Sequence, residues 1–228
     1  MLPPQTVKRD FSRACGIGPA MTALRTLFAT RVYEASLADA KDFPAFNREL
    51  EEAVRMLAGE DQAGRAWCRK QGYGGYTSYA SLDDLPARAT VFADLKRRLD
   101  RHVAAFAKDL ALDLGPRGRL TMDSLWVNVL KPGFGHSGHI HPHSVISGTV
   151  YVATPPGAAG LKLEDPRLSM MMAAPPRSAD APEDLTTFFT LAPAPGTVFL
   201  WESWLRHEVP PNGAKAERIS VSFNYAWR

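Results

Sequence analysis

Hydrophobic residues recur at helical spacing in the first half of the chain. Phe46, Leu50 and Val54 follow one another at intervals of four residues, which predicts a helix with one buried face. Asp42 precedes this pattern as a candidate N-cap, and Gly59 follows it as a candidate stop. The pattern therefore predicts a helix between these two residues.

A second, longer stripe predicts a helix from about Thr90 to Leu112. Its apolar members are Phe92, Leu95, Leu99, Val103, Phe106 and Leu110. Ahead of the first helix, the segment Leu27–Leu37 favours a short strand. Between the helices, Gly72–Tyr79 is rich in glycine but lacks the Lys-Ser/Thr pair of a phosphate-binding loop. We expect it to be a plain loop.

From Leu120 onward the pattern changes to short β-type segments separated by Gly and Pro. The predicted strands are Ser124–Leu130, Ser147–Ala153, Leu161–Glu164, Thr186–Leu191, Thr197–Trp201 and Arg218–Ala226. Many short strands with such turns indicate a sandwich or barrel. Covered by two helices, they would form a jelly roll with a helical backing layer, an α+β fold. The segment 173–182 is rich in Pro and Ala and predicts a loop.

Length and composition indicate one globular domain without disulfide or metal staples. The chain has 228 residues, of which 45% are hydrophobic and 22% charged. We predict an N-terminal extension at 1–20 and one domain at 21–228, helical to about 119 and β-rich from about 120.

A net charge of +3, with basic and acidic residues interleaved, does not favour a nucleic-acid partner. Two cysteines without a metal-binding spacing point to a reducing, cytoplasmic setting, and no apolar run predicts a membrane span.

Four of the six histidines crowd into eight residues, which packing and solubility do not explain. They are His136, His139, His141 and His143. In an extended segment, residues two apart point to the same face, so His139 and His141 can bind one metal ion. Pro142 bends the chain before His143, and His136 has the opposite parity, so both are expected at the surface or behind the ligands.

A third ligand must come from elsewhere in the chain, and the remaining histidines are His102, in the helical half, and His207. The position of His207 relative to Arg218 favours His207. The turn at 210–213 separates it from Arg218. If the flanking segments pair across this turn, His207 and Arg218 stand opposite each other, with Cβ atoms ~5 Å apart. Arg218 and Ser220 would then anchor a carboxylate beside the metal.

Alternation in the last strand supports this arrangement. Arg218 and Ser220 lie on a polar face, while Ile219 and Val221 lie on an apolar face that can pack on the helices. The polar face would then look into a cavity. The opposite orientation would place Arg218 in solvent and remove the anchor.

These residues resemble a known family, the 2-oxoglutarate- and iron(II)-dependent oxygenases, in a branch found in bacteria and phages. The resemblance covers the chain from about Met21 and is strongest after Trp126. It is carried by Trp126–Asn128, Gly138–Pro142, Ser147–Val152, Gly160–Arg167, Pro195–Gly196, His207–Asn212 and Glu217–Asn224.

The resemblance implies a double-stranded β-helix and an enzyme that uses iron(II) and 2-oxoglutarate. The distal carboxylate of 2-oxoglutarate would bind Arg218 and Ser220. An unidentified substrate would be oxidised, by hydroxylation, with release of succinate and carbon dioxide. Asn128 and Tyr151 are candidate residues of the cofactor site, with core packing as the alternative.

The sequence departs from the wider superfamily at one ligand position. The superfamily usually has a carboxylate two residues after the first histidine, and His141 stands there. We keep His141 as the ligand, with Asp165 or Glu202 as alternatives.

Two other classes of function fit parts of this pattern. A cupin-like three-histidine enzyme would not use 2-oxoglutarate and would leave Arg218 unexplained. A non-catalytic metal- or ligand-binding β-sandwich is the second alternative. The substrate, a small molecule or a peptide, and a possible homodimer are left open by the sequence.

Overall fold

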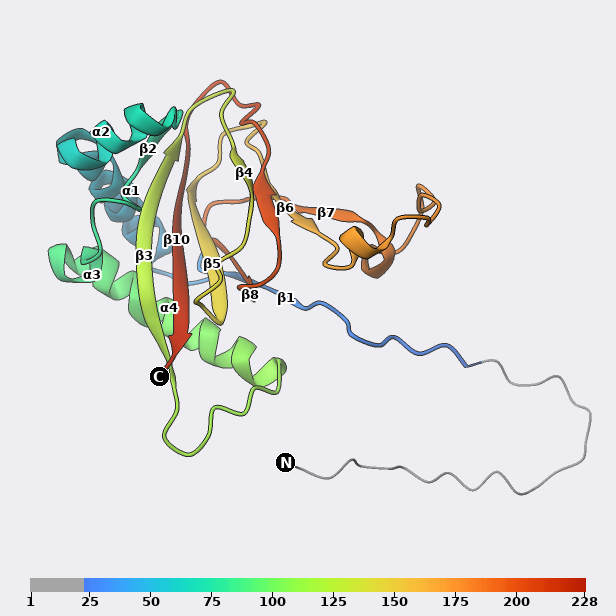
Figure 1. Ribbon diagram of the computed structural model, residues 1–228. Coiled ribbons are helices and arrows are strands. Elements are labelled where there is room, and N and C mark those ends of the chain that lie inside the picture. Colours follow the sequence, from blue (N-terminus) through green and yellow to red (C-terminus); the bar gives the residue numbers. More distant parts are fainter. Residues whose placement is uncertain (1–22) are drawn as a thin grey trace, which may run out of the picture.

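The computed structural model describes residues 23–228, which form two antiparallel sheets with helices packed on one side (Figure 1). The predicted N-terminal extension, residues 1–20, lies outside the described residues. The helices are α1 (Phe43–Glu60), α2 (Gln62–Gln71), α3 (Leu85–Arg88) and α4 (Thr90–Asp109), with 3-10 turns η1 (Leu168–Met170) and η2 (Glu183–Leu185). The strands are β1 (Val32–Ser36), β2 (Gly75–Thr77), β3 (Leu120–Leu130), β4 (His136–His139), β5 (Ile146–Ala153), β6 (Leu161–Glu164), β7 (Phe188–Leu191), β8 (Thr197–Glu202), β9 (His207–Val209) and β10 (Arg218–Trp227).

The larger sheet has the strand order β1-β8-β5-β10-β3-β2, and the smaller sheet has the order β4-β9-β6-β7. Neighbouring strands are antiparallel in both sheets. Strands far apart in sequence are neighbours, as in a jelly roll. The expected fold class is confirmed: an α+β protein with a double-stranded β-helix core backed by helices.

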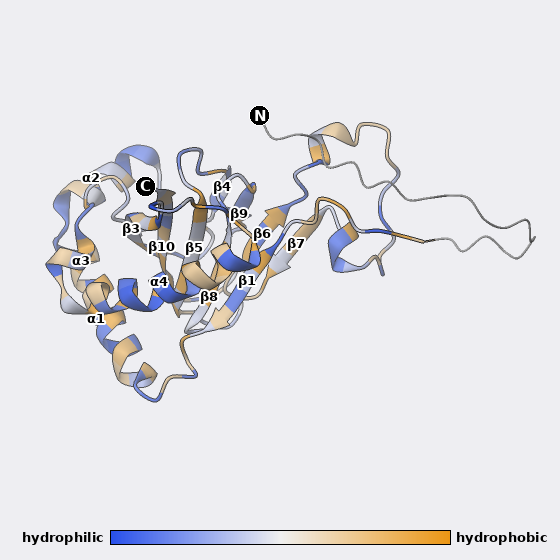
Figure 2. Ribbon diagram, turned by 90° about the horizontal axis from the view of Figure 1, so that it is seen from below, coloured by the Kyte–Doolittle hydropathy of each residue, from blue (hydrophilic) through white to orange (hydrophobic). Residues whose placement is uncertain are grey.

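Helices α1 and α4 cover the outer face of the larger sheet. Leu99 and Val103 of α4 share one hydrophobic cluster with Val221 and Phe223 of β10, and all four are buried. Hydrophilic and hydrophobic residues alternate around these helices (Figure 2), as a single buried stripe requires. This packing fixes which face of β10 turns toward the smaller sheet.

The predicted helices and strands are largely found. The helix starting after Asp42 ends at Glu60, one residue beyond the expected stop at Gly59. The long helix ends at Asp109, and the strand expected within Leu27–Leu37 is β1. Strands β4 and β9 were not predicted, because four and three residues are too short to show an alternating pattern.

The expectation of a plain loop at Gly72–Tyr79 is wrong. Strand β2 lies within this segment and pairs with the end of β3. Gly75 has a φ of +143°, and a Cβ there would lie 1.9 Å from the carbonyl oxygen of Val129. Only glycine allows this close approach, so the glycines that suggested a loop instead permit a strand.

Asp61 ties α2 to this added strand. Its carboxylate accepts a hydrogen bond from the Gly64 backbone N–H at 2.9 Å, which caps α2, and one from the Tyr76 hydroxyl at 2.8 Å. The helix and β2 are therefore held together at the end of the larger sheet.

The segment between β6 and β7 projects away from the two sheets (Figure 1). It includes η1 and η2 and the Pro- and Ala-rich stretch expected to be a loop, which has no strand or helix. None of the helices within 23–228 combines the length and apolar character needed to cross a membrane.

Replacement of Leu99 by alanine tests the contact between α4 and the sheet. Leu99 is fully buried, so Leu99→Ala is expected to lower the free energy of unfolding by about 2–5 kcal/mol. Urea denaturation followed by circular dichroism measures this change. Met56→Ala, at a half-exposed position on α1, should change it by less than about 0.5 kcal/mol. Equal effects of the two substitutions would contradict the assigned packing.

Candidate active site

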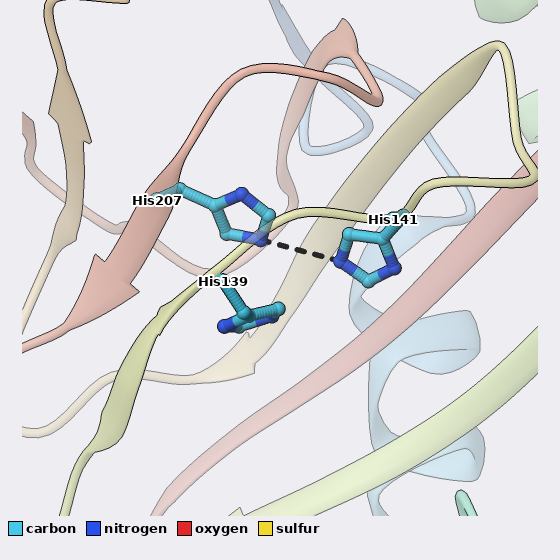
Figure 3. A group of neighbouring side chains, drawn as sticks. All are labelled: His139, His141 and His207. Atoms are coloured by element: carbon cyan, nitrogen blue, oxygen red, sulfur yellow. Dashed lines mark hydrogen bonds between the residues drawn. The ribbon is translucent and has the colours of Figure 1, made fainter. Parts of the chain in front are cut away.

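Three histidine rings meet between the two sheets (Figure 3). His139 ends β4, His141 lies two residues further, and His207 begins β9 beside His139. Each ring offers one nitrogen, and these three atoms lie within 4.8 Å of one another. The pair two residues apart and the distant third histidine are thus brought together, as expected.

Backbone carbonyl groups orient two of the rings. The Nδ1 atom of His139 lies 2.7 Å from the carbonyl oxygen of Ser137, and that of His207 lies 2.9 Å from that of Leu205. A ring nitrogen beside a carbonyl oxygen donates its hydrogen, which leaves the lone pair on Nε2. Both rings therefore present a metal-binding atom, and the hydrogen bonds hold their orientation.

The distance between two of these atoms fits a metal ion. The Nε2 atoms of His141 and His207 are 3.3 Å apart. Two imidazole nitrogens bound to one ion at about 2.0–2.1 Å would be separated by about 3.0–3.4 Å. Without an ion, the two nitrogens can share a hydrogen bond, drawn as a dashed line in Figure 3, and the same spacing suits a shared divalent ion.

Burial keeps two of the histidines neutral. It lowers the pKa of His141 to about 4, with a smaller contribution from His139. Burial also lowers the pKa of His207 to about 3. Neutral imidazole is the form that binds metal, so neither ring has to lose a proton at neutral pH.

The carboxylates considered as alternatives lie elsewhere. Asp165 is held by Arg167, whose Nε and Nη2 atoms each lie 2.9 Å from a carboxylate oxygen. Glu202 ends β8 and does not line the cavity that contains the histidines. Among residues 23–228, the one group with metal-binding geometry consists of the three histidines. This geometry favours His141 over either carboxylate.

The inner face of the larger sheet forms the facing wall. Ser220 of β10 is the register partner of Asn128 on β3 and of Tyr151 on β5. Arg218 lies two residues before Ser220, on the same face of β10. The four predicted cofactor residues thus occupy adjacent positions on three neighbouring strands, and all four are buried.

The predicted pairing of His207 with Arg218 across a hairpin is wrong. His207 pairs with His139 and Leu163 in the smaller sheet, whereas Arg218 pairs with Leu130 in the larger one. Prolines 210 and 211 cannot donate ladder hydrogen bonds, so the strand does not continue into a hairpin.

Asn212 fixes the path of the chain after these prolines. Its side-chain amide donates to the carbonyl oxygens of Leu130 and Ala216, at 3.2 and 3.1 Å. The connection therefore crosses from one sheet to the other. His207 and Arg218 line the same cavity from opposite walls, instead of from adjacent strands.

Arg218 is a buried charge without a counterion. Its side chain is 2% exposed, and no carboxylate of the described residues is paired with it. The guanidinium carbon lies 4.7 Å from the centre of the Tyr151 ring, a cation–π contact. That contact satisfies none of the N–H donors, and Nε has no hydrogen-bond partner.

Other orphaned polar atoms lie around the same cavity. The Tyr151 hydroxyl, the Asn128 Oδ1 and the Trp201 Nε1 are buried and have no partner within residues 23–228. All three residues and Arg218 line one cavity of about 650 Å³. Because buried polar groups are normally hydrogen-bonded, this concentration indicates a site for a polar ligand.

The sequence did not predict that Tyr73 and His136 line the cavity. The Tyr73 hydroxyl and Nε2 of His136 share a hydrogen bond of 2.7 Å, and both residues line the cavity. Burial lowers the pKa of His136 to about 4. His136 was expected behind the ligands or at the surface, and it is half-buried. His143 is exposed, as expected.

Two tryptophans next to the histidines were also not assigned to the site. Trp126 lies 5.8 Å from His141 and Trp201 lies 4.7 Å from His207, measured between ring centres. The alternation of β3, with Trp126 and Asn128 on the polar face, was a signal for the first. Trp201 carried no such signal, because the four residues before Glu202 in β8 are all apolar and do not alternate with polar ones.

The fold resembles solved oxygenase structures at low sequence identity. A prolyl-4-hydroxylase from Pseudomonas putida has a TM-score of 0.51 and 16% identity, with 86% of this chain and 89% of that chain covered. HygX from Streptomyces hygroscopicus, with iron bound, has a TM-score of 0.54 and 13% identity, with 87% and 83% covered. The epimerase SnoN, in complex with Fe3+, alpha ketoglutarate and nogalamycin RO, has a TM-score of 0.56 and 14% identity, with 87% and 79% covered. These likenesses establish the fold.

A family model matches the β-rich part of the chain. Residues 124–224 match the family described as "Putative 2OG-Fe(II) oxygenase". Comparison with curated proteins gave no match. This segment contains the whole predicted site, and its match is to the 2OG-Fe(II) oxygenases. The expected resemblance is confirmed, together with the enzyme class and the two cofactors that define it.

Loss of one histidine tests the assigned metal ligands. His207→Ala and His141→Ala should each weaken iron(II) binding by more than about 100-fold, because either change leaves two ligands. Anaerobic titration with a competing chromophoric chelator measures the affinity. His143→Ala removes an exposed histidine from the same stretch and should leave the affinity unchanged. Similar losses in all three variants would refute the assignment.

Proposed function

We propose that the protein is an iron(II)- and 2-oxoglutarate-dependent dioxygenase that hydroxylates a C–H bond of its substrate and releases succinate and carbon dioxide. One observation in the structure supports the proposal independently of the family match. A buried, unpaired arginine lies on the wall of the cavity whose other wall holds three converging histidines. Metal binding alone would not require this arginine.

The histidines would hold the iron from one side. His139 and His207 come from neighbouring strands of the smaller sheet and His141 from just beyond β4, so three ligand positions would be filled from this side. The cavity that these histidines line would leave room for 2-oxoglutarate and dioxygen. Because all three ligands are neutral, the positive charge of the ion would be balanced by the anionic cofactor instead of by a protein carboxylate.

Arg218 would bind the distal carboxylate of 2-oxoglutarate. A carboxylate beside the guanidinium would accept a hydrogen bond from Nε and another from the Tyr151 hydroxyl, so that two orphaned donors gain a partner. It would also supply the missing countercharge. Ser220 lies on the same face of β10 and can donate a further hydrogen bond.

Asn128 would have a supporting role. Its side-chain nitrogen donates to the Ser222 hydroxyl at 3.1 Å, and its Oδ1 atom is buried without a partner among the described residues. Rotating the amide by half a turn would let Ser222 donate to Oδ1 and would direct the NH2 group at the carboxylate. Asn128 thus supports the cofactor only with its amide in the second orientation.

The cofactors would supply the oxidising chemistry, and the protein would position them and exclude water. Iron with 2-oxoglutarate supplies the oxidising power, from dioxygen and the decarboxylation of 2-oxoglutarate. Behind the site, Phe199, Trp201 and Leu205 form a second buried cluster between the sheets, which excludes water from that side. The related solved structures include a hydroxylase and an epimerase, so the substrate must be inferred from the cavity.

Anaerobic titration with iron(II) and 2-oxoglutarate tests the proposal. When both are present, their chelate should give a visible charge-transfer band that neither gives alone. Arg218→Ala should weaken the apparent 2-oxoglutarate affinity by about 30-fold or more, since a buried carboxylate would lose its charged partner. Arg218→Lys should give an intermediate loss, because a lysine keeps the charge without the bidentate geometry.

A matched control is Arg97→Ala, which removes an exposed arginine from α4 and should leave the titration unchanged. Tight iron binding without a band would contradict the use of 2-oxoglutarate. That result would favour a cupin-like three-histidine enzyme, or a non-catalytic metal-binding protein.

A further inference from the structure

The open side of the cavity lies between the free edges of the two sheets. Strand β2 is the last strand of the larger sheet, and β4 is the last of the smaller one. Cavity-lining residues beside these strands include Tyr79, Phe134 and Ile140, which are 61%, 47% and 46% exposed. Their exposure marks the mouth of the cavity.

The mouth is aromatic and leads to the histidines. The ring of Tyr79 lies 5.3 Å from that of Trp126 at an interplanar angle of 71°. Trp126 in turn lies 5.8 Å from His141 at 31°. Phe134 packs against Gly74 at the start of the β2 segment, where a Cβ would overlap its ring. Aromatic surface thus continues from solvent to a metal-binding residue.

The cavity has no charge to offer a second ligand. Apart from the histidines, Arg218 is the one formally charged side chain among the lining residues, and the proposed function assigns it to 2-oxoglutarate. A charged substrate group would be desolvated here without a partner, which is costly. Polar lining near the mouth is neutral and includes Gln71 and Ser137, which suit hydroxyl or amide groups.

Tyr79, Phe134 and Ile140 remain exposed at the mouth among the described residues. Three large apolar residues around one opening are unusual for a surface that binds nothing. A cavity of about 650 Å³ exceeds what a five-carbon dicarboxylate needs and falls within the range of pockets for small organic ligands.

We propose that the substrate is an uncharged molecule with a planar ring, which lies against Trp126 and Tyr79 at the cavity mouth. This inference rests on the proposed function and adds the substrate class. Ring stacking would bring a C–H group attached to the ring toward His141 and the metal, while neutral polar groups would hold the rest of the molecule.

Four matched probes test the inference: 2-phenylethanol, 3-phenylpropanoate, 2-phenylethylamine and 2-cyclohexylethanol. The first three share a ring and differ in charge, and the fourth replaces the planar ring of the first. Binding is followed by fluorine NMR of protein labelled with 5-fluorotryptophan, in saturating 2-oxoglutarate and zinc(II). The Trp126 signal is assigned by its loss in Trp126→Phe.

We expect 2-phenylethanol to shift the Trp126 signal and to bind about fivefold more tightly than each of the other three probes. Tyr79→Ala, a change at an exposed position, should weaken this binding about fivefold without altering 2-oxoglutarate affinity. Phe188→Ala is the matched control, since Phe188 is a half-exposed aromatic residue on β7 outside the cavity. It should have no effect.

Tighter binding of a charged probe, equal binding of 2-cyclohexylethanol, or no effect of Tyr79→Ala would overturn the inference. If the iron and 2-oxoglutarate band is present in such a case, only the substrate class is wrong. If the band is absent, the proposed function fails, and a ring preference would no longer identify a substrate.

Discussion

The site depends on a buried positive charge that the protein does not neutralise. Arg218 is almost inaccessible and has no carboxylate partner among the described residues, although burying an unpaired charge costs several kcal/mol. The orphaned hydroxyl of Tyr151 lies next to it. A dicarboxylate that reaches from the histidines to this arginine would remove both costs, which explains why such an unfavourable arrangement persists.

The fold holds the two ends of such a ligand on different sheets. Strand β10 packs Val221 and Phe223 against the helices, so Arg218 and Ser220 must face inward. The short strands β4 and β9 place His139 and His207 side by side on the opposite wall. The helical layer therefore contributes to the site without touching it. Because the helices pack on the apolar face of β10, the polar face of that strand turns inward.

Local sequence patterns predicted the residues of the site better than the path of the chain between its strands. The two-residue spacing of His139 and His141 and the alternation of β10 depend on strand geometry alone, and both are found in the structure. The partner of His207 depended on whether the chain turns back or crosses to the other sheet after the two prolines. Hydrogen bonds from Asn212 to distant carbonyl groups settle that path, and no local pattern encodes them. The same limit applies to β2, where glycines needed for close strand packing look like those of a loop.

The central claim is that one dicarboxylate spans the cavity from a three-histidine metal site to Arg218. A crystal structure of the protein grown anaerobically with iron(II) and 2-oxoglutarate, with anomalous data collected at the iron edge, tests it most directly. The account predicts one iron peak bonded to the Nε2 atoms of His139, His141 and His207, and a cofactor whose far carboxylate contacts Arg218 and the Tyr151 hydroxyl. Iron bound by a carboxylate in place of His141, or a cofactor that leaves Arg218 unpaired, would contradict the account.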